Sequence, residues 1–122
     1  MRILFVTQIV PYPPHGGVLQ RGFNLLRELG RTHEVHLLAF HHPDELPPGE
    51  ALEQSRAELG KFCSAVEYFE LWPKKSTAHR FLGLGLAAMH SAPFSVLAHR
   101  NRRLSQRMAE LCQSDRPPEI VH

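Results

Sequence analysis

The residues best suited to chemistry form a proline- and glycine-rich loop near the start of the chain. Residues 11–17 (PYPPHGG) follow a short apolar run at residues 3–6 (ILFV). In an open parallel α/β sheet, ligands bind beyond the carboxyl ends of the strands. Paired glycines let the backbone approach a ligand and expose the N–H groups of the next helix, which suits phosphate. Gly16 and Gly17 therefore predict a substrate-binding loop, with His15 as a candidate contact beside them.

A second interpretation of the same glycines stays open, in which they only make a tight turn between a strand and a helix. The loop is not a dinucleotide-binding fingerprint, because no GxGxxG follows the strand. It is not a phosphate-binding Walker loop either, because no GK[ST] occurs.

The histidines and other reactive residues predict neither a metal site nor a catalytic group that can be named. His41, His42 and Asp44 could in principle bind a metal, but their spacing is not that of a structural site. Solvated loop residues are the better interpretation. His33 and His36 flank a predicted strand, and we expect both at an edge or on the surface. No serine or cysteine lies in a nucleophile elbow, so the catalytic residues stay unknown.

The elements that would position the loop alternate between strand and helix. The run at 3–6, a helix over 18–29 closed by Gly30 as a C′ glycine, and a strand over 35–40 form one right-handed βαβ unit. Glu67 and Glu70 fall on both sides of a third strand and place it near a sheet edge. The remaining predictions are a helix over 51–62, that strand over 66–71, helices over 77–90 and 96–112, and a fourth strand from 119. The fold class is α/β, with a mainly parallel, Rossmann-like sheet flanked by helices.

Composition and charge fit one soluble domain with an uneven surface. The 122 residues carry a net charge of +2, divided into +2 over residues 1–40, −5 over 41–73 and +5 over 74–122. The two cysteines, Cys63 and Cys112, have no metal-ligand spacing, and we expect reduced, partly buried thiols. No signal peptide or membrane-spanning run is recognisable, which favours a cytoplasmic protein.

A basic amphipathic stretch lies in the helix predicted over 96–112. Its charge comes from Arg100, Arg102, Arg103 and Arg107. It forms either a solvated helix face, which we favour, or a peripheral contact with anionic lipid or an acceptor phosphate. Nucleic acid is not an expected partner, because the charge is confined to one end and lacks an aromatic stacking platform.

The opening of the chain resembles the start of retaining GT-B glycosyltransferases of family 4. The matching features are the strand at 3–6, the loop PPHGG, the helix ending LLREL and the second strand after HEV. The later segments PFSVLAHRNRRLSQRMAEL and RPPEIVH are similar to the helix and fourth strand of the same N-terminal domain. The sequence resembles in particular the sugar transferases of bacterial exopolysaccharide synthesis.

The resemblance implies a function for the chain. In this family the N-terminal domain holds the acceptor, and its glycine loop, matched by Gly16 and Gly17, reaches toward the donor's phosphates. His122 matches the first histidine of the family's H-x-H pair after the fourth strand. The parent enzyme would transfer a sugar from a nucleotide-sugar substrate to a glycan or lipid-linked acceptor, with no metal or cofactor implied.

The family's nucleotide-sugar domain does not occur in these 122 residues. Two pairs, Glu45 with Glu53 and Glu50 with Glu58, have the spacing of its two-glutamate motif but lack the family's glycine and proline context, so we interpret both matches as coincidence. We therefore expect a partial N-terminal domain that is inactive or nearly so by itself. Two alternatives stay open: a stand-alone acceptor- or membrane-binding module that pairs with a separate catalytic half, and an unrelated Rossmann-like nucleotide-binding enzyme.

Overall fold

The part of the chain that this computed structural model describes contains four strands and three helices with defined bounds, and residues 81–82, 84–85 and 88–89 are helical too. The described residues are 1–43, 46–70, 81–82, 84–85, 88–89 and 101–122. The elements are β1 (Arg2–Thr7), α1 (Gly16–Leu29), β2 (Glu34–His41), α2 (Glu50–Leu59), β3 (Ala65–Glu70), α5 (Arg102–Cys112) and β4 (Ile120–Val121).

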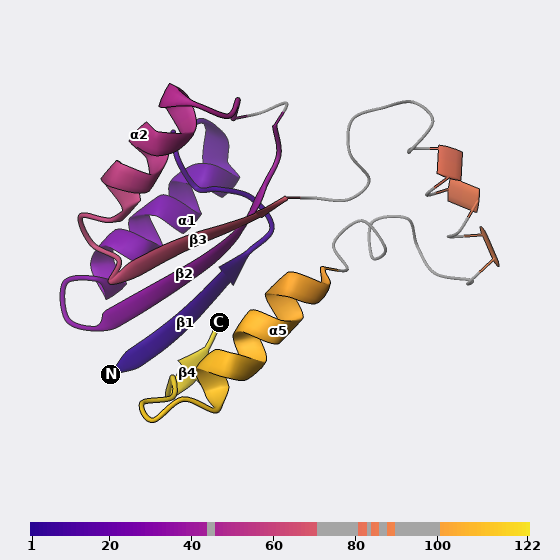
Figure 1. Cartoon of the computed structure of the whole chain (residues 1–122). Coiled ribbons are helices and arrows are strands. Elements are labelled where there is room, and N and C mark those ends of the chain that lie inside the picture. Colours follow the sequence, from indigo (N-terminus) through magenta and orange to yellow (C-terminus); the bar gives the residue numbers. More distant parts are fainter. Residues whose placement is uncertain (44–45, 71–80, 83, 86–87, 90–100) are drawn as a thin grey trace.

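All four strands join one parallel sheet in the order β3-β2-β1-β4. Helices α1 and α2 cover one face of the sheet and α5 covers the other (Figure 1). This arrangement confirms the α/β fold class and the parallel βαβ unit at the start of the chain. It also places the loop after β1 at the carboxyl edge of the sheet.

Strands β1 and β2 contain unbroken runs of apolar residues because both faces of these strands are buried. Side chains alternate across a strand, so Ile3 and Phe5 of β1 pack under α1 and α2, whereas Leu4 packs under α5. Strand β2 divides in the same way, with Leu37 on the first face and Leu38 on the second. The two central strands therefore hold the three layers together.

Strand β3 is outermost on its side of the described sheet, as the two glutamates predicted. Its residues run from 65 to 70, one earlier than expected. Helix α5 begins at Arg102, not at residue 96, because Asn101 is extended and its side chain accepts a hydrogen bond from the Leu104 N–H at 3.1 Å. The helix predicted over 77–90 and the start of the one predicted over 96–112 lie largely outside the described residues.

Two glycines end helices in a right-handed conformation. Gly30 has φ −66° and ψ −13°, so it is not the left-handed C′ glycine that the sequence suggested. Glycine fits this position because it has no Cβ, and a Cβ there would lie 2.1 Å from the Phe62 carbonyl oxygen. Gly60 has the same dihedral angles at the end of α2, but a Cβ there would lie 3.0 Å from its nearest neighbour.

The two cysteines differ in environment. Cys63 is buried in the core beneath α1 and α2, and burial raises its thiol pKa to about 11. Cys112 is exposed at the end of α5, so the expectation of a partly buried thiol was wrong there. In the part of the chain that the structure describes, no helix is long and apolar enough to cross a membrane.

Candidate functional site

The loop after β1 is anchored by buried side chains before it reaches the glycines. Val10 and Pro11 are buried. Pro11 lies so close to Gly22 of α1 that a Cβ added at Gly22 would be 3.3 Å from the Pro11 Cβ. The Thr7 hydroxyl donates to the Ile9 carbonyl oxygen at 3.1 Å. A cis peptide bond joins Tyr12 to Pro13. The loop is thus tied to the sheet at one end and to α1 at the other.

The paired glycines form the first turn of α1, which begins two residues earlier than predicted. Gly16 has φ +79°, a left-handed conformation that favours glycine. A Cβ at Gly16 or at Gly17 would meet no described atom within 4 Å, so the described residues crowd neither position. His15 occupies the N-cap, and its side chain makes no capping hydrogen bond to the described residues.

The start of α1 therefore has the features of an anion-binding helix terminus. The first N–H groups of a helix have no partner within the helix, and they lie at its positive dipole end. The first turn of α1 contains no acidic residue that would compete with a bound anion. Phosphate is the ligand that this arrangement suits best.

A pocket of about 60 Å³, here called the loop pocket, opens beside the glycines. Its lining is mainly apolar, with two imidazoles: Ile9, Val10, Tyr12, Pro13, His15, Leu19, His42 and Leu46. Of the four predicted site residues, His15 lines this pocket and the two glycines follow it directly in the chain. The structure thus brings His15, Gly16 and Gly17 together at the carboxyl edge of the sheet.

His122 lies apart from the loop pocket. It follows β4 and is held beside β1, where its N–H donates to the Leu4 carbonyl oxygen and its own carbonyl accepts from the Val6 N–H, both at 2.8 Å. Its ring lies 4.9 Å from the ring of Phe5, on the sheet face that α1 and α2 cover. His122 does not line the pocket that His15 lines.

Two adjacent histidines support the pocket wall, a role that the sequence did not reveal. His41 is buried, and its Nε2 donates to the Leu46 carbonyl oxygen at 2.7 Å. The Nε2 of His42 donates to the Gln8 carbonyl oxygen at 2.9 Å. The expectation of a solvated loop residue was therefore wrong for His41, which is buried at the end of β2, whereas His42 lies in the loop after β2 and is half-buried. Among the described residues, which exclude Asp44, no cluster of three or more potential ligands is placed to hold a metal ion.

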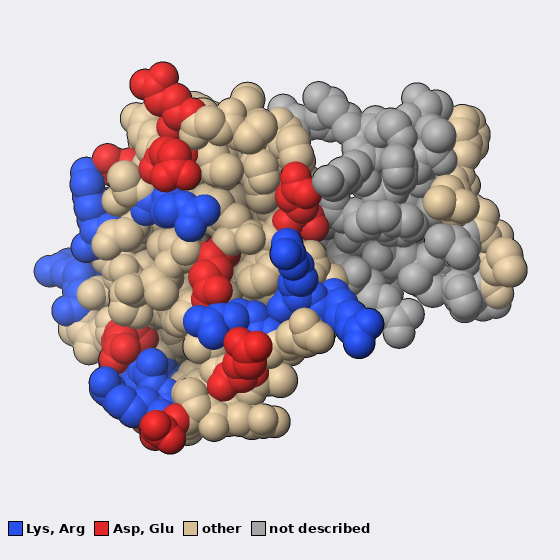
Figure 2. All heavy atoms as spheres, in the orientation of Figure 1, with Lys and Arg blue, Asp and Glu red and all other residues tan. Residues whose placement is uncertain are grey.

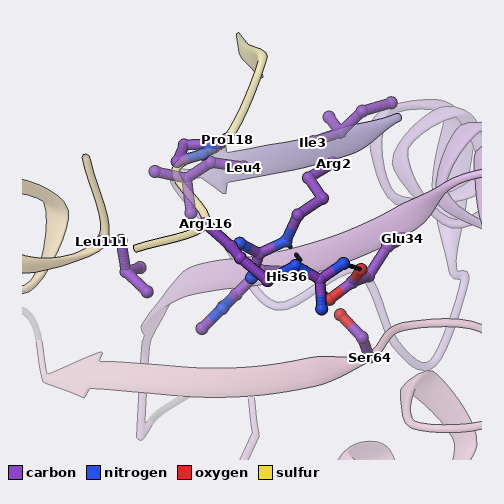
Figure 3. A pocket seen from close by; sticks show the side chains of 9 residues that line it. All are labelled: Arg2, Ile3, Leu4, Glu34, His36, Ser64, Leu111, Arg116 and Pro118. Atoms are coloured by element: carbon purple, nitrogen blue, oxygen red, sulfur yellow. Dashed lines mark ion pairs between the residues drawn. The ribbon is translucent and has the colours of Figure 1, made fainter. Parts of the chain in front are cut away.

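A charged group at the opposite edge of the sheet, here called the amino-edge cluster, consists of Arg2, Glu34 and Arg116. Both arginines pair with the Glu34 carboxylate, Arg2 at 3.3 Å and Arg116 at 3.5 Å. Figure 3 shows these side chains meeting around a pocket of about 20 Å³ from β1, β2 and the loop before β4. Because Glu34 joins β2 to that loop, we interpret the cluster as a support for β4.

An ionic link also joins α5 to the sheet through Glu67 of β3. Glu67 pairs with His36 of β2. The His36 side chain is half-buried, so the expectation of a surface residue was wrong. The same carboxylate accepts from the Arg107 Nε at 2.9 and 3.0 Å. Hydrogen bonds from Arg107 to Glu67 and Glu110 raise the pKa of its guanidinium.

The basic face of α5 is therefore partly neutralised. Figure 2 shows acidic and basic side chains side by side over this helix and the neighbouring strand. Arg102 and Arg103 are exposed, whereas Arg107 is held by two carboxylates; Arg100 lies outside the described residues.

Comparison of the chain with known protein families, with curated proteins and with solved structures finds no match.

Proposed function

We propose that the chain is the acceptor-side, Rossmann-like domain of a retaining GT-B glycosyltransferase of the family 4 type. The observation that carries the proposal is the paired-glycine start of α1 at the carboxyl edge of a parallel sheet. Gly16 and Gly17 are not crowded by described residues, and His15 lines a pocket beside them. The resemblance of residues 1–40 to the family supplies the reaction.

In this proposal the donor is a nucleotide-sugar and the acceptor is a hydroxyl of a glycan or lipid-linked glycan, as in exopolysaccharide synthesis. The glycine loop stabilises negative charge on the departing diphosphate, since preorganised N–H groups act most strongly where charge develops. Holding the acceptor close to the donor supplies the rest of the rate enhancement by orientation. The reaction takes place in the cytoplasm, at the inner face of the membrane when the acceptor is lipid-linked.

An activity assay tests whether a separate donor-binding domain is required. The 122-residue chain, mixed with a panel of nucleotide-sugars and glycan acceptors, is expected to show no sugar transfer, because the nucleotide-binding half of the site belongs to that domain. Transfer above the rate of a protein-free blank would contradict this part of the proposal.

The gene itself tests the two-domain architecture. Reading the DNA after the codon for His122 is expected to show, in frame or after one frameshift, a second Rossmann-like domain with two glutamates separated by seven residues. A stop codon followed by unrelated sequence would contradict the architecture, and it would favour a binding module that acts with a separately encoded partner.

A further inference from the structure

We propose that the loop pocket binds the acetamido group of an N-acetylated sugar. This inference rests on the proposed function, because it assigns one substituent of the sugar that the domain would hold. It concerns the apolar pocket, whereas the diphosphate would lie at the glycines.

The size of the loop pocket selects a small group. A cavity of about 10–15 Å³ holds one water molecule, and an apolar cavity of about 150 Å³ holds a benzene ring. The loop pocket, at about 60 Å³, lies between these sizes. It is too small for a sugar ring but large enough for an acetyl substituent.

Core packing and two hydrogen bonds hold the walls of the loop pocket in place. Val10 and Leu46 are 4% and 7% exposed and belong to the core beneath α1 and α2. The hydrogen bond from His41 holds the Leu46 backbone, and the one from His42 holds the backbone of Gln8. Walls held in this way lower the cost of rearrangement when a methyl group enters and gains contacts.

The rim of the loop pocket supplies a polar partner for the amide. His15 is exposed, and within the described structure its side chain makes no capping hydrogen bond. An imidazole N–H can donate to an acetamido carbonyl oxygen.

This chemistry discriminates between sugars that differ at one position. Burying one methyl group strengthens binding about fourfold, so N-acetylglucosamine should bind more tightly than glucose. Glucosamine should bind most weakly, because its ammonium group would lose water in an apolar pocket.

The test is a titration of the isotope-labelled 122-residue chain, followed by the methyl signals of Ile9, Val10 and Leu46. N-acetylglucosamine and N-acetylgalactosamine are expected to shift these signals, and glucose and glucosamine are expected to shift them at least fourfold less at equal concentration. Equal responses to all four sugars, or none to the acetylated pair, would overturn the proposal.

Two variants localise the response. Leu19→Phe should fill the pocket and abolish the shifts, whereas Leu25→Phe, on the same helix but outside the pocket lining, should leave them unchanged. If Leu19→Phe does not fold, His15→Ala removes the rim imidazole without touching the core and should weaken the response. Unchanged shifts in the folded pocket variants would overturn the assignment.

Inorganic diphosphate separates this inference from the proposed function. If diphosphate shifts the Gly16 and Gly17 amides but acetylated sugars leave the pocket methyl groups unmoved, the acetamido assignment fails and the glycosyltransferase proposal stands. If acetylated sugars bind but diphosphate has no effect on the glycines, the pocket assignment stands and the role proposed for the glycine loop fails.

Discussion

At the scale of single residues, Gly16 determines the shape of the candidate site. Its φ of +79° lies in the left-handed region, whereas Gly17 next to it does not require that region. Neither position would bring a Cβ into contact with a described atom. Because neither position is crowded, a comparison of the two glycines tests the effect of backbone conformation alone.

Alanine substitutions at the two glycines should have different effects on stability. Gly16→Ala is expected to lower the free energy of unfolding by about 1–2 kcal/mol, because a side chain is strained at positive φ. Gly17→Ala is expected to leave it unchanged or to raise it by up to about 1 kcal/mol, because alanine is the better helix residue. Urea denaturation measures both. Equal losses at the two positions would show that the left-handed conformation is not required.

Gly30 and Gly60 form a second matched pair, which separates crowding from conformation. Their dihedral angles are the same, but a Cβ at Gly30 would lie 2.1 Å from the Phe62 carbonyl oxygen. Gly30→Ala should cost about 1–3 kcal/mol, as forced overpacking does, and Gly60→Ala should change stability by less than about 1 kcal/mol. Thermal or urea unfolding checks this order, and a larger loss at Gly60 would contradict it.

At the scale of elements, Asn101 joins the start of α5 to the end of β3. Its side-chain oxygen accepts from the Leu104 N–H, and its Nδ2 donates to the Glu70 carbonyl oxygen at 3.2 Å. The periodic pattern of the sequence predicted helix through this residue, but Asn101 is extended and caps the start of α5. Asn101 thus fixes where α5 begins and ties it to the sheet.

Substitutions at Asn101 should separate these two functions. Asn101→Ala loses both the cap and the link to Glu70, and it is expected to cost about 1–2 kcal/mol. Asn101→Asp keeps a capping oxygen but loses the donor, so its cost should be smaller. Equal losses in the two variants, measured by urea denaturation, would mean that the cap contributes nothing.

At the scale of the whole molecule, the sequence predicted the layers better than the contacts. Unbroken apolar runs identify β1 and β2 because both of their faces are buried, and the charges of Glu67 and Glu70 identify β3 as an edge strand. These signals are local, so they can be read from neighbouring residues. The start of α5 was misplaced because apolar periodicity does not show where a cap replaces a helical residue.

The contacts that shape the candidate site join residues far apart in the chain. His42 reaches Gln8, and His36 meets Glu67 across adjacent strands, so no local pattern shows that these histidines are held in place. His15, Gly16 and Gly17 were predicted together because they are consecutive. His122 was predicted from the family resemblance alone, and the fold places its ring against Phe5, away from the loop pocket.

The central claim is that the open start of α1 binds the diphosphate of a nucleotide-sugar, and one titration tests it most directly. Nucleotide-sugars are added to the ¹⁵N-labelled chain while the amide signals of Gly16, Gly17 and Val18 are followed, with the corresponding nucleosides as phosphate-free controls. We expect shifts of these three amides that depend on the diphosphate and are weaker in Gly16→Ala. Loop amides that do not respond to nucleotide-sugars, or that respond equally to the nucleosides, would contradict the claim.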